Sequence, residues 1–151
     1  MLEHLKSHLE GKVVILGVGN IMRGDDGVGS LLAAGIQGKV PFTVFDTGTT
    51  PENYLGKAIK EDPGLILIID AVDFSGQAGE FRVLEEGDFK TVNLFSTHNA
   101  SLSMLINFLK SSCSADIMIL IIQPKRIGLS EKLSPEVEKT LSGLKGWFLS
   151  L

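Results

Sequence analysis

Acidic residues follow three apolar segments of the sequence, at places where their carboxylates could bind a metal ion. Asp25 and Asp26 come after the first segment, Asp46 ends the second and Asp70 ends the third. Crowded carboxylates repel one another unless some are protonated, water screens them or a cation lies among them. Two carboxylates and one neutral imidazole, here that of His98, make an incomplete ligand set for a divalent transition metal, with positions left for water or substrate.

The segments before these acids are predicted to be strands of one sheet. Val13–Gly17 and Leu65–Ile69 contain no polar residue, which is typical of parallel strands buried on both faces. Pro41–Asp46 is β-branched and aromatic, as strands often are. Parallel strands bring their carboxyl ends to one edge of the sheet, and Thr97-His98-Asn99 opens a predicted helix that faces the same edge. We therefore expect the acids and the imidazole of His98 to converge there.

The rest of the pattern predicts an α/β fold. Apolar residues at helical spacing, with N-cap and proline signals, indicate four helices. Glu80–Leu84 follows the third strand too closely for a crossover helix, so it is expected to be an antiparallel edge strand. The order predicts a three-layer αβα sandwich around a mostly parallel, twisted five-stranded sheet with one antiparallel edge strand. The expected strands are 13–18, 41–46, 65–70, 80–84 and 117–122, and the expected helices are 30–37, 50–61, 99–112 and 135–146.

Composition is consistent with a single cytoplasmic domain over residues 1–151, with a polar N-terminal extension at 1–11. The net charge of −4 argues against nucleic acid or an anionic membrane as a partner. No apolar run approaches the roughly 20 residues that span a bilayer, and the extension lacks the apolar core of a secretory signal. The extension is expected to form a frayed turn of helix, with no specific role for His4 and His8.

Each candidate residue also has a purely structural interpretation. Asp25 is expected to cap the following helix and to favour its dipole. Asp46 and Asp70 could be turn-forming residues or helix caps, and Asp73 is expected to be a loop residue. His98 taken alone could be a residue at the start of a helix, bonded to a backbone carbonyl. One cap needs only one acid, so Asp26 remains available for chemistry. The convergence favours metal binding for Asp26, Asp70 and His98.

Other catalytic and binding motifs match the sequence poorly. Gly17-Val18-Gly19 is similar to the start of a dinucleotide-binding fingerprint, but Met22 stands at the third glycine position. The adjacent carboxylates of Asp25 and Asp26 would also repel a pyrophosphate. No Gly-x-Ser-x-Gly nucleophile elbow occurs, and the single cysteine, Cys113, is expected to be a packing or surface residue. The residues themselves therefore indicate an acidic, metal-type site on a parallel α/β sheet.

Several short motifs, in order along the chain, resemble those of the hydrogenase maturation endopeptidases. The resemblance extends from about Lys12 to Trp147, so the N-terminal extension lies outside it. Each motif alone is weak, and their combination is specific. The motifs are Gly17-Val18-Gly19-Asn20, Gly24-Asp25-Asp26-Gly27-Val28-Gly29, Asp46-Thr47-Gly48, Pro51-Glu52-Asn53, Leu67-Ile68-Ile69-Asp70-Ala71-Val72-Asp73, Gly79-Glu80-Phe81-Arg82, Ser96-Thr97-His98-Asn99, Ile122-Gln123-Pro124 and Leu133-Ser134-Pro135-Glu136-Val137.

The resemblance implies a protease that removes the C-terminal extension of a nickel–iron hydrogenase large-subunit precursor after nickel insertion. It implies that the nickel is supplied by the precursor, that no small-molecule cofactor is needed, and that Asp26, Asp70 and His98 are the metal ligands and catalytic residues. A metal-polarised carbonyl or a metal-activated water could then carry out hydrolysis, with Asp25 or Asp46 as a possible base. The alternatives are a nucleotide-binding doubly wound module and a non-catalytic chaperone of the hydrogenase nickel site.

Overall fold

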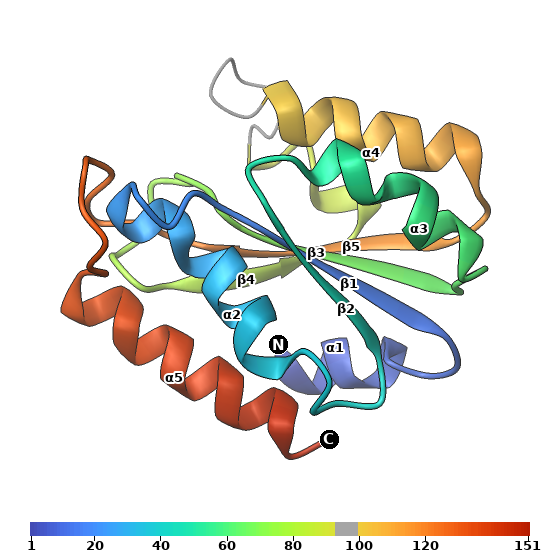
Figure 1. Cartoon of the computed structure of the whole chain (residues 1–151), viewed down its shortest axis with the longest axis horizontal. Coiled ribbons are helices and arrows are strands. Elements are labelled where there is room, and N and C mark those ends of the chain that lie inside the picture. Colours follow the sequence, from blue (N-terminus) through green and yellow to red (C-terminus); the bar gives the residue numbers. More distant parts are fainter. Residues whose placement is uncertain (93–99) are drawn as a thin grey trace.

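A five-stranded mixed sheet forms the centre of the computed structural model, which describes residues 1–92 and 100–151 (Figure 1). The strand order is β2-β1-β3-β5-β4. The first four strands in this order are parallel, and β4 is antiparallel to β5 at the edge. The predicted sheet is therefore confirmed. The strands are β1 (Val13–Val18), β2 (Thr43–Gly48), β3 (Leu65–Ala71), β4 (Phe81–Leu84) and β5 (Asp116–Ile122).

Helices cover both faces of the sheet, which gives the three predicted layers. Helices α1, α2 and α5 lie on one face, and α3 and α4 lie on the other (Figure 1). Successive residues of a strand point to opposite faces, so Val13 and Ile15 of β1 pack with the first group of helices and Val14 and Leu16 with the second. The helices are α1 (Leu2–His8), α2 (Val28–Ile36), α3 (Leu55–Lys60), α4 (Ala100–Ser112) and α5 (Pro135–Leu149).

The structure differs from the predicted elements in several places. Strand β2 spans Thr43–Gly48 rather than 41–46, and α5 continues to Leu149 rather than ending at 146. A 3₁₀ turn, η1 (Gly24–Gly27), precedes α2, which begins two residues earlier than expected. The helix predicted over 50–61 is divided into the 3₁₀ turn η2 (Pro51–Tyr54) and α3. The N-terminal extension forms the helix α1 rather than a frayed turn, because Leu5 is fully buried in the core. A third 3₁₀ turn, η3 (Glu86–Asp88), follows β4. Within the described residues, no helix is long and apolar enough to cross a membrane.

Two glycines bring α2 into direct contact with the sheet. A Cβ atom added to Gly17 would lie 2.3 Å from the Cβ of Ala33, and one added to Gly29 would lie 2.3 Å from the carbonyl oxygen of Val18 and 2.4 Å from that of Ile69. Real Cβ atoms do not approach other atoms so closely. The glycine pattern that is similar to a nucleotide fingerprint thus serves the packing of α2 against β1 and β3.

Replacing Gly29 by alanine is expected to destabilise the protein by about 3 kcal/mol, because the sheet and α2 must separate to admit the methyl group. Chemical denaturation of the purified variant measures this loss. Gly143→Ala is the matched control, since an added Cβ there meets nothing within 4 Å. In an exposed helix position this change should stabilise the protein by about 0.5–1 kcal/mol. Equal effects of the two substitutions would contradict the packing role of Gly29.

Candidate functional site

The turn between β1 and α2 holds Asp26 at the carboxyl edge of the sheet. Asp26 lies in η1, and its Oδ2 accepts a hydrogen bond of 3.2 Å from the backbone N–H of Asn20. The side-chain oxygen of Asn20 in turn accepts a bond of 2.9 Å from the backbone N–H of Met22. A Cβ on Gly19 would lie 2.3 Å from the carbonyl oxygen of Asp26, so this turn closes tightly over η1. The position of the Asp26 carboxylate is therefore fixed by local backbone contacts.

Asp70 lies near the end of the central strand β3, where it pairs with Ile121 of β5. Burial raises the pKa of Asp70 well above its ordinary value, the negative charge of Asp26 raises it further, and a hydrogen bond from the backbone of Ala71 offsets only part of this. The structure thus brings Asp26 and Asp70 close enough for their charges to repel. The ionised pair is costly without a cation.

The third predicted ligand, His98, lies outside the described residues. Its role as a ligand stays a prediction. Helix α4 begins at Ala100, on the side where β1 and β3 end (Figure 1).

The raised pKa of Asp70 predicts how stability changes with pH in the absence of metal. The folded protein holds the Asp70 proton to a higher pH than the unfolded chain does, so the free energy of unfolding should fall as pH rises from the ordinary value of 3.8 through the raised pKa. Asp70→Asn removes the titrating carboxyl group and with it this dependence of the free energy of unfolding on pH. The stability of the variant relative to the natural protein should therefore increase with pH, as measured by denaturant unfolding over a pH series. A constant or decreasing difference would contradict the burial and repulsion of this carboxylate.

Asp25, the neighbour of Asp26, has a different environment and a structural role. It is fully buried, and its Oδ2 accepts hydrogen bonds from the backbone N–H groups of Lys125 and Arg126 at 2.8 and 2.9 Å and from the hydroxyl of Ser134 at 2.8 Å. Its Oδ1 accepts a bond of 2.7 Å from the backbone N–H of Ser134. The prediction that Asp25 caps α2 is wrong, because this carboxylate instead joins η1 to the loop before α5.

The pKa of Asp25 reflects these contacts. Burial of the carboxyl raises the pKa, but the hydrogen bonds from the backbone of Arg126, Ser134 and Lys125 and from the Ser134 hydroxyl outweigh it, so the net shift is downward. Asp25 is thus ionised, and both of its carboxylate oxygens accept hydrogen bonds from the protein. The two adjacent acids therefore differ: one is held by the protein on both oxygens, and the other faces a second carboxylate.

Asp46 also has local partners. Its Oδ1 accepts hydrogen bonds from the hydroxyl of Ser30 and from the backbone N–H of Gly48, the latter at 3.2 Å. Asp46 and Gly48 both lie in β2, and their contact coincides with an irregularity in the pairing of β2 with β1. Asp46 lies in the wall of a shallow groove of about 420 Å³ that also includes Asn20 and Tyr54. The prediction that the second strand ends at Asp46 is wrong by two residues, because β2 continues to Gly48.

Gln123 shapes the loop that leaves β3, a role that was not predicted from the sequence. Its side-chain oxygen accepts hydrogen bonds from the backbone N–H groups of Phe74 at 2.9 Å and Gly76 at 3.1 Å. Its amide nitrogen donates to Oδ1 of Asp73 at 3.0 Å. Gln123 is buried and follows β5, so it fixes the loop beside Asp70. The only available signal was its presence in the Ile122-Gln123-Pro124 motif. Asp73 is a loop residue, as predicted.

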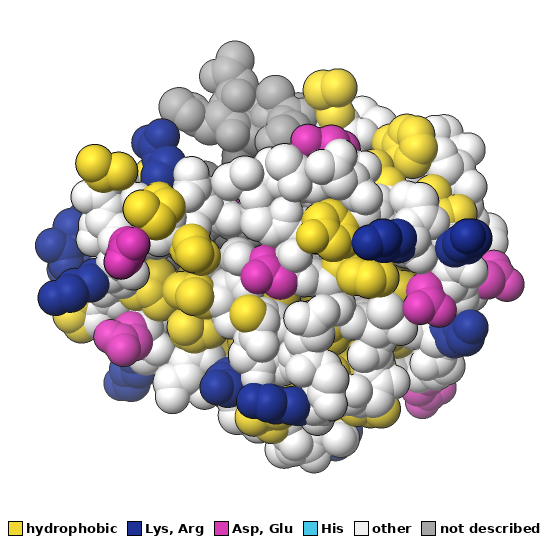
Figure 2. Space-filling model, in the orientation of Figure 1, with side chains coloured by type: hydrophobic (Ala, Val, Ile, Leu, Met, Phe, Trp, Pro, Cys, Tyr) yellow, Lys and Arg dark blue, Asp and Glu magenta, His cyan; other side chains and the backbone are white. Residues whose placement is uncertain are grey.

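An apolar surface flanks the turn that holds Asp26. Figure 2 shows hydrophobic side chains gathered at the left of the visible face, over the turn before α2 and the loop before α5 in Figure 1. These two segments are in contact, since the backbone N–H of Ser130 donates to the carbonyl of Met22 at 3.0 Å. Leu129 is 92% exposed. Exposed apolar clusters of this kind commonly mark protein interaction sites. The exposed members are Ile21, Met22, Ile127 and Leu129.

Comparison with known proteins matches most of the chain to the family that its sequence motifs resemble. The family model described as hydrogenase maturation protease matches residues 27–146. The hydrogenase 3 maturation protease of Escherichia coli K12 is 35% identical over 140 residues, which cover 89% of each protein.

Solved structures of similar proteins share the fold. The crystal structure of the NiFe hydrogenase maturation protease HycI from Thermococcus kodakarensis KOD1 is similar, with a TM-score of 0.85, 31% identity and coverage of 97% of both chains. The solution structure of the endopeptidase HycI from Escherichia coli matches with a TM-score of 0.79 and 30% identity, covering 93% of this chain and 90% of that one. The glycine-rich turn with its paired acids, the α/β sheet and these matches lead to one conclusion: the chain belongs to the hydrogenase maturation protease family.

Proposed function

We propose that this protease removes the C-terminal extension of a nickel–iron hydrogenase large-subunit precursor, and that nickel already inserted in the precursor is what it recognises. Family membership supports proteolysis in hydrogenase maturation. One observation carries the nickel part of the proposal, namely the position of Asp26 and Asp70 within range of mutual repulsion at one edge of the sheet. A cation supplied by the substrate would relieve this repulsion at the moment of binding.

The chemistry of the donor set fits nickel. Carboxylate oxygens and an imidazole nitrogen are common ligands of divalent first-row metals, and His98 would supply the imidazole. Two or three protein ligands leave room for the ligands that the precursor itself provides. The cost of ionising Asp70 beside Asp26 favours binding of a cation that arrives with substrate over an empty, doubly charged site.

The residues of the site have separate roles in the proposed reaction. Asp26, held by the backbone of Asn20, and Asp70, held at the end of β3, would position the nickel of the precursor against the enzyme. When bound, nickel supplies a Lewis acid that can polarise the scissile carbonyl or activate a water molecule. Asp25 is not the base in this proposal, because both of its oxygens accept hydrogen bonds within a buried environment.

A protein substrate also fits the surface beside the site. The exposed apolar side chains of Ile21, Met22, Ile127 and Leu129 lie next to η1. A precursor segment that covered them would bury apolar area and place its scissile bond near Asp26. The proposed partner is therefore the large-subunit precursor itself.

Mass spectrometry of a co-expressed large subunit tests this function. With the protease present, the precursor should lose a C-terminal peptide, and without it the precursor should keep its full mass. A stable complex of the two proteins with an unchanged precursor mass would instead indicate a non-catalytic chaperone. No complex and no change in mass would contradict the proposed substrate.

A further inference from the structure

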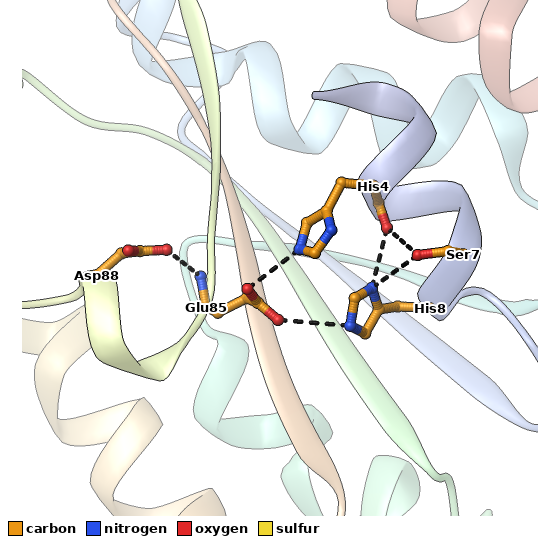
Figure 3. Close-up of polar contacts among 5 residues, drawn as sticks. All are labelled: His4, Ser7, His8, Glu85 and Asp88. Carbon is orange, nitrogen blue, oxygen red and sulfur yellow. Dashed lines mark hydrogen bonds and ion pairs between the residues drawn. The ribbon is translucent and has the colours of Figure 1, made fainter.

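We propose that His4, His8 and Glu85 form a binding site for a divalent transition-metal cation of the Zn²⁺ type (Figure 3). One ligand atom from each side chain lies within 4.8 Å of the other two. The cluster lies at the amino ends of the parallel strands, whereas Asp26 and Asp70 lie at their carboxyl ends. This follows because α1 precedes the start of β1 and Glu85 follows the end of the antiparallel β4. It is therefore separate from the nickel-recognition site proposed above and does not rest on that proposal.

The fold presents these three side chains to one another. His4 and His8 are four residues apart in α1, so their rings lie on the same face of the helix, with centroids 4.6 Å apart. Leu5, fully buried in the core, anchors α1 to the domain. On the other side, the backbone N–H of Glu85 donates to Oδ2 of Asp88 at 3.0 Å, which closes a capping box at the start of η3. Both halves of the cluster are thus fixed by contacts of their own (Figure 3).

The spacing of the ligand atoms suits a small cation. Nε2 of His4 lies 3.1 Å from one carboxylate oxygen of Glu85, and Nε2 of His8 lies 3.4 Å from the other. Ligands around tetrahedral zinc are separated by about 3.3 Å, as follows from metal–ligand distances of about 2.0–2.2 Å. Small side-chain rotations would bring Nε2 of His4, Nε2 of His8 and one carboxylate oxygen of Glu85 around one ion. Such a site leaves a fourth position for water.

The second nitrogen of His8 is oriented by the protein backbone. Nδ1 of His8 lies 2.9 Å from the carbonyl oxygen of His4 and therefore donates a hydrogen bond to it, with the Ser7 hydroxyl also nearby at 3.3 Å. In the neutral imidazole this leaves the Nε2 lone pair directed at the carboxylate of Glu85. Two acceptors then face each other, and either a proton on Nε2 or a metal cation between them resolves the conflict. A ligand histidine whose other ring nitrogen donates to a backbone carbonyl is a common feature of metal sites.

The chemistry of these ligands selects the class of metal. Two imidazoles and one carboxylate suit Zn²⁺ and its neighbours among the divalent transition metals, whereas Mg²⁺ and Ca²⁺ prefer oxygen ligands. Bound metal would join the N-terminal helix to the loop after the edge strand, across 81 residues of chain. It would therefore act as a structural clamp at the end of the sheet remote from proteolysis.

Calorimetric titration of the purified, metal-free protein with Zn²⁺ tests the site, together with thermal unfolding with and without Zn²⁺. The Asp26→Asn/Asp70→Asn variant serves as the background, so that the carboxylates of the proposed nickel-recognition site do not contribute to the measured Zn²⁺ binding. We expect one Zn²⁺ per chain and a rise in the melting temperature. His4→Ala and Glu85→Gln should each weaken Zn²⁺ binding by about tenfold or more, and Co²⁺ in place of Zn²⁺ should show the visible absorption of a low-coordinate site.

The matched control is Glu3→Gln, which removes an exposed acid of the same helix and should leave Zn²⁺ binding unchanged. The variants are at exposed positions, and their melting temperatures without metal verify folding. Absence of Zn²⁺ binding would overturn the proposal and would indicate that the cluster is only an ion-pair network. Binding that survives both His4→Ala and Glu85→Gln would also overturn it. Neither result bears on precursor cleavage, which is measured separately.

Discussion

Asp25→Asn is expected to destabilise the protein by about 3–5 kcal/mol, the largest stability loss predicted here. The Asp25 carboxylate accepts four hydrogen bonds in the protein interior, three of them on Oδ2. In asparagine one oxygen becomes an amide nitrogen that can only donate. Whichever way the amide is turned, that nitrogen faces the N–H groups of the loop or the N–H of Ser134, so buried donors lose their acceptor.

Denaturant unfolding at neutral pH measures this loss. The lowered pKa of Asp25 adds a pH dependence: its stabilising effect is present above the ordinary value of 3.8 and is lost as pH falls through the folded-state pKa. The difference between the natural protein and Asp25→Asn should therefore shrink in acid. A loss below about 0.5 kcal/mol, the size of an ordinary surface substitution, would contradict the structural role of Asp25.

Asp26→Asn and Asp70→Asn are expected to reduce precursor processing by about 100-fold or more while leaving the protein folded. Each substitution removes the negative charge of a proposed nickel ligand, and even indirect supports of metal ligands contribute 10–100-fold. Each also removes one side of the repulsion between Asp26 and Asp70. Activity should therefore be lost without a loss of stability, the reverse of what a damaged fold would show. Cleavage assays by mass spectrometry, run beside denaturant unfolding, measure both quantities.

Asp116→Asn is the matched control for these two variants. It is the same chemical change at an exposed aspartate. Asp116 is at the start of β5 and thus at the opposite ends of the parallel strands from Asp26 and Asp70. Processing by this variant should equal that of the natural protein. Full activity in Asp26→Asn would remove Asp26 from the site, and lost activity in Asp116→Asn would show that the assay responds to something other than the proposed ligands.

The adjacent acids show what could and could not be predicted from the sequence. The apolar runs before Asp26 and Asp70 predict parallel strands, and parallel strands bring their ends together, so the proximity of these two residues follows from local pattern and topology. The role of Asp25 does not follow from local pattern or topology. Its partners, Lys125, Arg126 and Ser134, are about a hundred residues away in the chain, and no local signal indicates that their backbone N–H groups meet its carboxylate.

The N-terminal extension was misjudged for a similar reason. The segment contains three leucines, Leu2, Leu5 and Leu9, at the spacing of one helix face, but a pattern this short does not show that the helix packs on the domain. In the structure Leu5 is fully buried in the core, and Leu2 and Leu9 pack against it, which holds α1 in place. The 3₁₀ turn η1 was also not predicted, because it depends on close packing against the turn at Gly19, where an added Cβ would lie 2.3 Å from the carbonyl oxygen of Asp26. Both errors concern contacts between segments rather than propensities within them.

Incubation of the purified protease with nickel-loaded and nickel-free forms of the same precursor tests the central claim most directly. Intact mass spectrometry over time measures release of the C-terminal peptide. If Asp26 and Asp70 recognise nickel carried by the substrate, only the nickel-loaded precursor should be shortened. Equal cleavage of the two forms would contradict recognition through the metal, although the protein would remain a protease.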